Sequence, residues 1–197
     1  MLEQLDFMFG YAAATYEEAH VLREAGVKKP ILILGYTFPY CYEELIREEI
    51  RPAVYRRDTV EELVAAAAKV GQKAKVHIKV DTGMGRIGIT PDEEGLEFVR
   101  FLMGHPELEV EGIFTHFAVS DEPGEQCEAY TRHQFQLFTD VIAKVEEKLG
   151  KRFLIRHCAN TGAVARYPET WLDMVRPGLL LYGYGEFAEE LGLLPVM

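Results

Sequence analysis

Residues 77–89 read HIKVDTGMGRIGI, in which an apolar strand runs into a glycine-rich loop. Alternate residues of a strand share a face, so His77, Lys79 and Asp81 lie on one face and the apolar residues between them on the other. The loop carries Arg86. Two cations and a carboxylate therefore converge where a strand ends, which favours a functional site over a structural lysine.

Outward from this segment, short apolar runs alternate with amphipathic ones. The apolar runs predict strands at residues 7–12, 30–35, 51–55, 74–80, 110–116, 153–157 and 174–181, and the amphipathic runs predict helices at 16–25, 41–49, 60–70, 92–103, 126–149 and 161–167. Such alternation is typical of a parallel sheet with helices outside it. An open doubly wound sheet and a (β/α)₈ barrel both fit. Seven units that begin abruptly on a strand favour a barrel without its first strand.

Three of the predicted helices follow a T-x-x-E capping box. The boxes pair Thr15 with Glu18, Thr59 with Glu62, and Thr90 with Glu93, the last with Pro91 at the first helical position. The segment 126–149 has an apolar stripe at helical spacing and is followed by Gly150, a residue typical of helix ends.

Composition and charge exclude several classes of protein. The 197 residues are 48% hydrophobic and 27% charged, which indicates one ordinary globular domain spanning residues 1–197. The net charge of −11 argues against binding to nucleic acids or anionic membranes. Three widely spaced cysteines without a CxxC pair predict neither a metal site nor a disulfide. With no signal peptide or membrane span, we expect a soluble cytoplasmic protein.

Three other strand ends carry candidate site residues, because barrel active sites form where strands end. His116 follows the run at 110–116, and HCANTG at 157–162 offers Asn160 and Thr161 to a phosphate. In VRPGLLLYG at 175–183, Arg176 interrupts an apolar run and needs a partner there. Gly178, followed by backbone N–H groups, predicts a phosphate cradle.

Four segments, in this order, resemble the alanine racemase family of pyridoxal-phosphate (PLP) enzymes. They are VDTGMGRIGI (80–89), THFA (115–118), HCANTGA (157–163) and VRPGLLLYG (175–183). The resemblance implies a (β/α)₈ barrel, PLP as cofactor, and interconversion of L- and D-alanine for bacterial peptidoglycan.

The same resemblance assigns a role to each candidate residue. Arg86 is expected to bind the phenolic oxygen of the cofactor and to lie near the substrate carboxylate. Lys79 matches a lysine that several relatives carry as a carbamate, which orients that arginine. His116 is expected to lie against the pyridine ring.

The remaining candidates are expected around the cofactor's phosphate and ring nitrogen. Thr161 and the backbone N–H groups of Gly178 and Leu179 would hold the phosphate, with Asn160 beside them. Arg176 would face the pyridine nitrogen. Because a guanidinium does not give up its proton, that nitrogen would stay unprotonated and the ring would be a weaker electron sink.

Two catalytic groups of the family have no match in this sequence. One is the lysine on the first barrel strand that links covalently to PLP, and the other is a tyrosine of a C-terminal β-domain supplied by the partner subunit. We therefore expect a partial barrel with seven of eight βα units, inactive alone, that holds PLP non-covalently at best. Lys79 lies on the wrong strand to substitute.

The alternatives are a non-catalytic PLP-binding or regulatory module and one part of a split racemase. A barrel without its first strand also exposes sheet edges at 7–12 and 174–181. We therefore expect a homo-oligomer that covers both edges.

Overall fold

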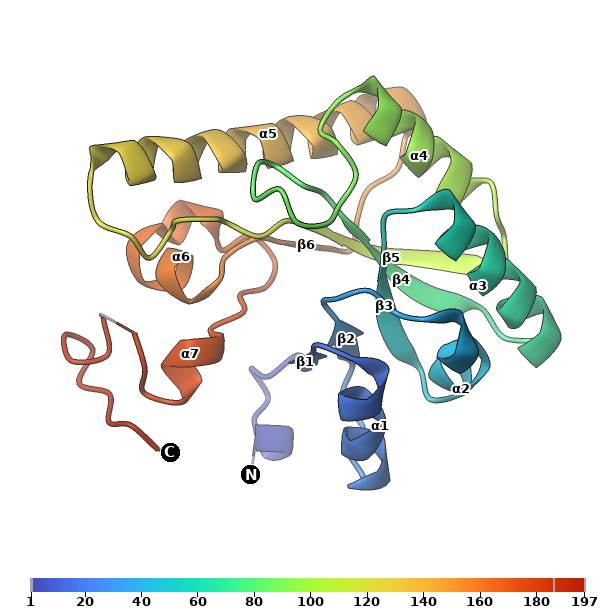
Figure 1. Ribbon diagram of the computed structural model, residues 1–197, viewed down its shortest axis with the longest axis horizontal. Helices are drawn as coiled ribbons and strands as arrows, with labels where there is room; N and C mark the ends of the chain where they lie inside the picture. The colour runs from blue at the N-terminus through green and yellow to red at the C-terminus, as the bar shows by residue number, and fades with distance from the viewer. Residues whose placement is uncertain (1, 186, 197) are drawn as a thin grey trace. The chain divides into compact units, whose positions relative to one another are not determined.

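Six short strands alternate with helices along the chain (Figure 1). The computed structural model describes residues 2–185 and 187–196. The strands are β1 (Tyr11–Ala13), β2 (Ile31–Ile33), β3 (Ile50–Val54), β4 (Ala74–Lys79), β5 (Leu108–Phe114) and β6 (Ile155–His157). They are hydrogen-bonded in sequence order, and the pairs from β1 to β4 are parallel.

The helices are α1 (Tyr16–Glu24), α2 (Tyr42–Arg47), α3 (Arg57–Val70), α4 (Glu93–Met103), α5 (Glu125–Leu149), α6 (Thr161–Arg166) and α7 (Gly178–Leu181), with 3₁₀ turns η1 (Leu2–Gln4), η2 (Pro39–Cys41) and η3 (Pro168–Thr170). Helices α1 to α5 lie between the strands and α6 and α7 follow β6; all but α7 lie close to the predicted ranges. None of the described helices is long and apolar enough to cross a membrane.

The chain folds as two compact units. Unit 1 comprises the residues up to 79 together with 97–112, and unit 2 comprises 80–96 together with the residues from 113 onwards. In unit 1, Ile31, Ile33, Ile50 and Ile78 are fully or almost fully buried. Strands β2 and β3 are buried along both faces, as is typical of a parallel sheet covered by helices.

The prediction of a seventh strand at 174–181 is wrong, because Gly178–Leu181 forms the short helix α7. Pro177 has no N–H to give to a sheet. The N–H of Arg176 donates to the carbonyl of Ala159, and the N–H of Gly178 turns back to the carbonyl of Arg176. Leu179 and Leu181 are 55% and 51% exposed, so the apolar run is not a buried strand. The part of the chain that the structure describes therefore has six strands.

Of the three predicted capping boxes, the one at Thr15 forms in part: the threonine caps the helix, but the carboxylate of Glu18 accepts from the N–H of Ala14, the residue before the cap. Thr15 caps α1, since its Oγ1 accepts a hydrogen bond from the N–H of Glu18. Thr59 lies inside α3, which begins two residues earlier. Asp92, and not Thr90, caps α4, because its carboxylate accepts from the N–H groups of Glu94 and Gly95, the second and third residues of that helix. Gly150 ends α5 in the left-handed conformation, as predicted.

Candidate functional site

The glycine-rich loop after β4 is closed by one carboxylate. Oδ1 of Asp81 accepts hydrogen bonds from the N–H groups of Gly83 and Gly85, each at 3.0 Å. The N–H of Asp81 donates to the carbonyl of Ile89 at 2.9 Å. Gly88 has a φ of 139°, and a Cβ there would lie 2.4 Å from the nitrogen of Asp81. This close approach requires glycine and explains the spacing of the motif.

Arg86 lies exposed on this closed loop. Within the described residues, no hydrogen bond or ion pair holds its guanidinium. The loop therefore presents a positive charge that is available to an anionic group of a ligand.

Beneath the loop, Thr115 joins several segments of unit 2. Its Oγ1 donates to the carbonyl of Val80 at 2.9 Å and lies 2.8 Å from Oγ1 of Thr82. The amide of Gln134 on α5 bonds to Thr82 and to the carbonyl of His116 at 3.3 and 3.4 Å. These threonines and Gln134 are buried. Because every link is satisfied inside the protein, the network holds the loop and the residues after β5 in one arrangement.

Arg176 contacts residues of unit 2 at the ends of two strands. Its Nη2 donates to the carbonyls of Thr115 and Cys158 at 2.8 and 3.2 Å. Its Nη1 lies 2.6 Å from Nδ1 of His157. Nε is shielded from solvent and has no hydrogen-bond partner among the described residues. Burial lowers the pKa of Arg176 to about 10, so the side chain remains charged at neutral pH.

The contact with Arg176 fixes the protonation of His157. A guanidinium only donates hydrogen bonds, so Nδ1 of His157 must accept and the neutral ring carries its proton on Nε2. The imidazole stacks on the ring of Phe114, with centroids 4.8 Å apart and planes inclined by 5°. The guanidinium also lies over Phe114, 5.5 Å from its centroid. Arg176 thus keeps its charge among aromatic rings and carbonyls, and no carboxylate of the described residues contacts it.

The proposed phosphate ligands lie at the start of α7. The N–H of Leu179 donates to Oγ1 of Thr161 at 3.0 Å. The N–H of Gly178 is used by the carbonyl of Arg176 at 2.9 Å, and a Cβ at Gly178 would meet nothing within 4 Å. Thr161 and Leu179 are therefore brought together, and the space beside Gly178 is open.

Asn160 has a structural task in the same region. Its Oδ1 caps α6 through the N–H of Ala163 at 3.2 Å and accepts from Oγ of Ser120 at 2.6 Å. Its Nδ2 donates to the carbonyl of Phe117 at 3.3 Å. A Cβ at Gly162 would lie 2.6 Å from the nitrogen of Asp121. These contacts pack the HCANTG turn tightly against the segment after β5.

Lys79 and His116 complete the predicted set. Lys79 is the last residue of β4, in unit 1, and is buried. His116 is half-buried in unit 2, two residues after β5.

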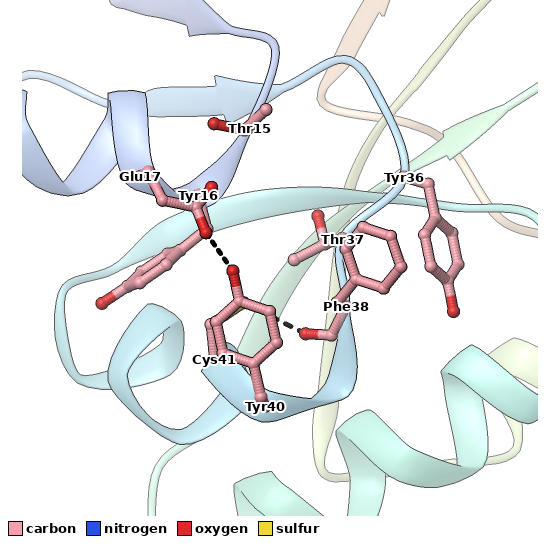
Figure 2. A pocket seen from close by; sticks show the side chains of 8 residues that line it. All are labelled: Thr15, Tyr16, Glu17, Tyr36, Thr37, Phe38, Tyr40 and Cys41. Carbon is pink, nitrogen blue, oxygen red and sulfur yellow. Dashed lines mark hydrogen bonds between the residues drawn. The ribbon is translucent and has the colours of Figure 1, made fainter.

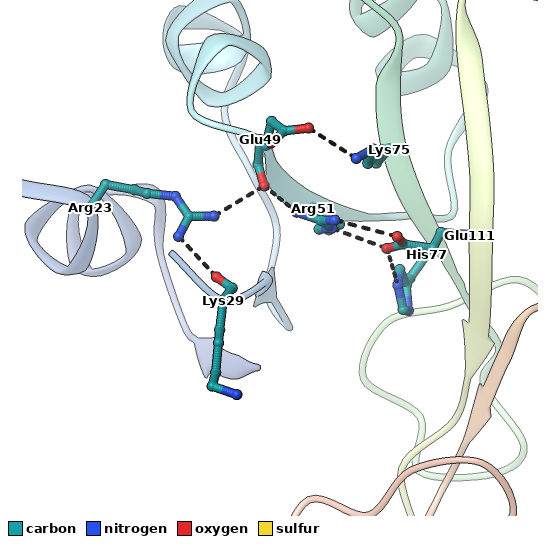
Figure 3. Close-up of polar contacts among 7 residues, drawn as sticks. All are labelled: Arg23, Lys29, Glu49, Arg51, Lys75, His77 and Glu111. Atoms are coloured by element: carbon teal, nitrogen blue, oxygen red, sulfur yellow. Dashed lines mark hydrogen bonds and ion pairs between the residues drawn. The ribbon is translucent and has the colours of Figure 1, made fainter. Parts of the chain in front are cut away.

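Unit 1 contains a second buried polar cluster, shown in Figure 3. Arg51 on β3 makes two bonds to the carboxylate of Glu111 on β5, at 3.0 and 3.3 Å. Nε2 of His77 on β4 lies 3.3 Å from the same carboxylate. The hydrogen bond from His77 and the guanidinium of Arg51 lower the pKa of Glu111 to about 2, against the effect of burial. This cluster is balanced in charge, and the sequence did not indicate it.

Comparison with known proteins identifies the family. The model of the alanine racemase N-terminal domain matches residues 7–186. The chain belongs to this family. It is 49% identical to the alanine racemase of Desulforamulus reducens over 172 residues, which cover 87% of this chain and 45% of that protein. It is 44% identical to the alanine racemase of Desulfovibrio desulfuricans over 192 residues, which cover 95% of this chain and 50% of that protein.

Solved alanine racemases have the same fold. The Clostridium difficile 630 enzyme in complex with cycloserine matches with a TM-score of 0.85 and 36% identity, covering 89% of this chain and 48% of that one. The Bacillus anthracis enzyme with bound L-Ala-P gives a TM-score of 0.80 and 34% identity, covering 93% and 46%. The chain thus has the α/β fold of the family's barrel in incomplete form, and it spans about half the length of these relatives.

Several residues around the alanine racemase motifs were missed from the sequence. Thr115 and His157 lie inside quoted motifs, but nothing in the motifs reveals that both contact Arg176. Gln134 had a detectable signal, because it lies four residues from both Tyr130 and Phe138 and interrupts the apolar stripe of α5.

Proposed function

We propose that this chain supplies the cofactor-binding barrel of a PLP-dependent alanine racemase, which interconverts L- and D-alanine. The observation that carries the proposal is Arg176, a half-buried side chain whose guanidinium has one unused N–H and no carboxylate partner among the described residues. A buried charge without a counter-ion is costly, and such groups cluster at functional sites.

The residues present fit PLP. The unused Nε–H of Arg176 suits a ring nitrogen that accepts a hydrogen bond. Thr161 already accepts from the N–H of Leu179, so its hydroxyl hydrogen remains to donate to a phosphate oxygen. The open space beside Gly178 leaves room for that phosphate.

When bound, PLP withdraws electrons from the substrate and makes its α-hydrogen acidic. Arg176 would leave the ring nitrogen unprotonated, because a guanidinium keeps its own proton at neutral pH. Thr161 would donate its hydroxyl to the phosphate, and Asn160 would hold the turn on which Thr161 lies. The N–H groups of Leu179 and Gly178, which here donate to Thr161 and to the carbonyl of Arg176, would exchange these acceptors for phosphate oxygens.

Three further residues complete the proposed site. Arg86 would bind the phenolic oxygen of the cofactor and the carboxylate of alanine. His116 would pack against the ring. Lys79 would act as a carbamate that orients Arg86, which suits a buried lysine at the end of a strand.

We further propose that the 197 residues alone do not racemise alanine, since the sequence has no match to the two catalytic bases of the family. General acid–base groups typically contribute about 10²–10⁴-fold each. The whole enzyme would work in the cytoplasm and provide D-alanine for peptidoglycan.

Equilibrium dialysis with PLP tests this function. We expect wild-type protein to bind PLP reversibly, so that dialysis against buffer without PLP removes it, and Arg176→Met to bind PLP at least about tenfold more weakly, the effect of losing about 1.4 kcal/mol. Glu61→Gln on α3 is the matched control. Equal retention of PLP by wild type and Arg176→Met would refute the cofactor assignment.

A chiral assay for D-alanine and borohydride reduction address activity. We expect no D-alanine above the rate with free PLP, and no reduced adduct on Lys79. An adduct mapped to Lys79 would show that this residue takes the place of the family's lysine.

A homo-oligomer remains part of the proposal. The exposed Leu179 and Leu181, together with Phe7 at 82% exposure, are apolar surface that a second copy would cover. Sedimentation should show a dimer or larger species at low micromolar concentration, and a stable monomer would contradict it.

A further inference from the structure

Unit 1 contains a hollow at the ends of β1 and β2, and none of the residues assigned above lines it. Its volume is about 280 Å³. Two segments line it, the start of α1 and the loop that runs from β2 through η2 (Figure 2). The lining residues are Thr15, Tyr16, Glu17, Tyr36, Thr37, Phe38, Tyr40 and Cys41.

Two side chains hold the backbone of this loop in place. The hydroxyl of Tyr42 donates to the carbonyl of Thr37 at 2.9 Å, and Sγ of Cys41 donates to the carbonyl of Phe38 at 3.1 Å. Thr37 and Cys41 are buried, whereas Phe38 and Tyr40 remain 59% and 70% exposed. The anchored loop thus displays two aromatic side chains that the core does not use.

The aromatic rings of the hollow form a continuous surface. Tyr36 and Phe38 meet edge to face with centroids 4.9 Å apart, and Phe38 lies nearly parallel to Tyr40 at 6.4 Å. The face of each ring carries negative electrostatic potential, so rings grouped in this way attract cations.

The charge in the hollow also favours a cation. Among the lining residues only Glu17 is charged, and the hydroxyl of Tyr40 donates to its carboxylate (Figure 2). That hydrogen bond lowers the pKa of Glu17, so the carboxylate is ionised at neutral pH. Arg56 approaches Tyr36 at 6.0 Å but pairs with Asp58, so its charge is balanced.

We propose that this hollow binds a small primary alkylammonium cation, with its methylene chain against Phe38 and Tyr40 and its N–H groups donating to Glu17. The carboxylate repels anions, and it favours a head group with N–H donors over a quaternary one. The alkyl chain covers the exposed rings. This proposal does not rest on the proposed racemase function.

The test uses n-butylammonium chloride as probe in phosphate buffer, since Tris is itself a primary amine. NMR of the aromatic side chains follows the titration. We expect saturable shifts of Tyr36, Phe38 and Tyr40 with a Kd in the millimolar range. Glu17→Gln, which keeps the shape of the side chain, should weaken binding about tenfold. Phe38→Leu, which removes the ring, should weaken it about fivefold.

Matched controls lie outside the hollow. Glu61→Gln removes a carboxylate from α3 and Phe7→Leu removes an exposed ring near the N-terminus, so both should bind as wild type. Unchanged backbone spectra establish that each variant is folded. Butan-1-ol or tetramethylammonium binding as tightly as n-butylammonium would overturn the proposal, and so would the absence of saturation at about 100 mM probe.

Discussion

Each unit of the molecule holds an arginine beside a histidine, but only the arginine of unit 1 is paired with a carboxylate of the described residues. In unit 1, Arg51 is paired through two hydrogen bonds with Glu111, which His77 also contacts. In unit 2, Arg176 donates to two carbonyls and to the neutral ring of His157, with no carboxylate among its described partners. The first cluster is complete within the protein, and the second still carries net charge and a free donor.

The difference separates two uses of a buried charge. A buried ion pair whose members satisfy each other is part of the folded structure. Removing one member destabilises the fold, because the other charge stays buried without a partner. A charge held only by dipoles is stabilised less, and it can interact strongly with a ligand that brings acceptors or negative charge. The comparison therefore predicts that changes in unit 1 affect stability, whereas changes at Arg176 affect ligand binding.

The largest effect is expected from Glu111→Ala. This change leaves Arg51 buried without its carboxylate, which should lower the free energy of unfolding by about 3–5 kcal/mol. Urea denaturation measures the loss. Glu109→Ala is the control, because Glu109 lies two residues away on the same strand and is exposed. A loss below about 1 kcal/mol would mean that the cluster in unit 1 is not a structural pair.

The pH dependence of stability sharpens the same point. The pKa of Glu111 falls from an ordinary 4.5 to about 2 in the folded protein. The folded state therefore gains about 3 kcal/mol from this carboxylate above its ordinary pKa, and loses it as the pH falls through 4.5 towards 2. Urea titrations of wild type and Glu111→Gln should differ at pH 7, and the difference should shrink below pH 4.5 and vanish only as the pH approaches 2. A difference that does not change with pH would show that the carboxylate does not carry the effect.

At Arg176 the expected change in stability is smaller. Arg176→Met removes a charge that is costly to bury, but it leaves the acceptors of Thr115, Cys158 and His157 unsatisfied. These terms oppose each other, so we expect a loss of about 1 kcal/mol in unfolding free energy. PLP affinity, in contrast, should fall at least about tenfold. A loss of stability as large as that of Glu111→Ala would make Arg176 a structural residue and remove the contrast between the units.

Local sequence patterns predicted most of the fold. Apolar runs overlap all six strands, although the run at 7–12 shares only Tyr11 and Ala12 with β1, and Gly150 marked the end of α5. Strand periodicity and helix termination depend on neighbouring residues. The prediction of a strand at 174–181 failed because the composition of this segment suits a buried strand, whereas its conformation depends on Arg176, which bonds to residues up to 61 positions away. Such contacts are set by the tertiary fold and leave no trace in local periodicity.

The candidate site was predictable only in part for the same reason. Motifs named Arg176, Thr161 and Asn160 but not their partners. Thr115 and Gln134 act through contacts between segments, and the pairing of Arg51 with Glu111 joins residues 60 positions apart. The roles of the named residues in binding PLP stay predictions.

The smallest effect is expected at Thr161, whose hydroxyl accepts from the N–H of Leu179. Thr161→Ser keeps this hydroxyl and should change the free energy of unfolding by less than about 0.5 kcal/mol. Thr161→Val keeps the shape but removes the acceptor, at a cost of about 1 kcal/mol. Because Leu179 is exposed, its N–H then faces water and should exchange hydrogen for deuterium faster than in wild type. Amide exchange followed by NMR separates the two variants, with the amide of Val145 in the buried face of α5 as internal reference.

If the hydroxyl also holds phosphate, Thr161→Val weakens PLP binding while Thr161→Ser retains it. Equal PLP affinity in both variants, with faster exchange only in Thr161→Val, would make this hydrogen bond purely structural and leave Arg176 as the distinguishing feature of unit 2.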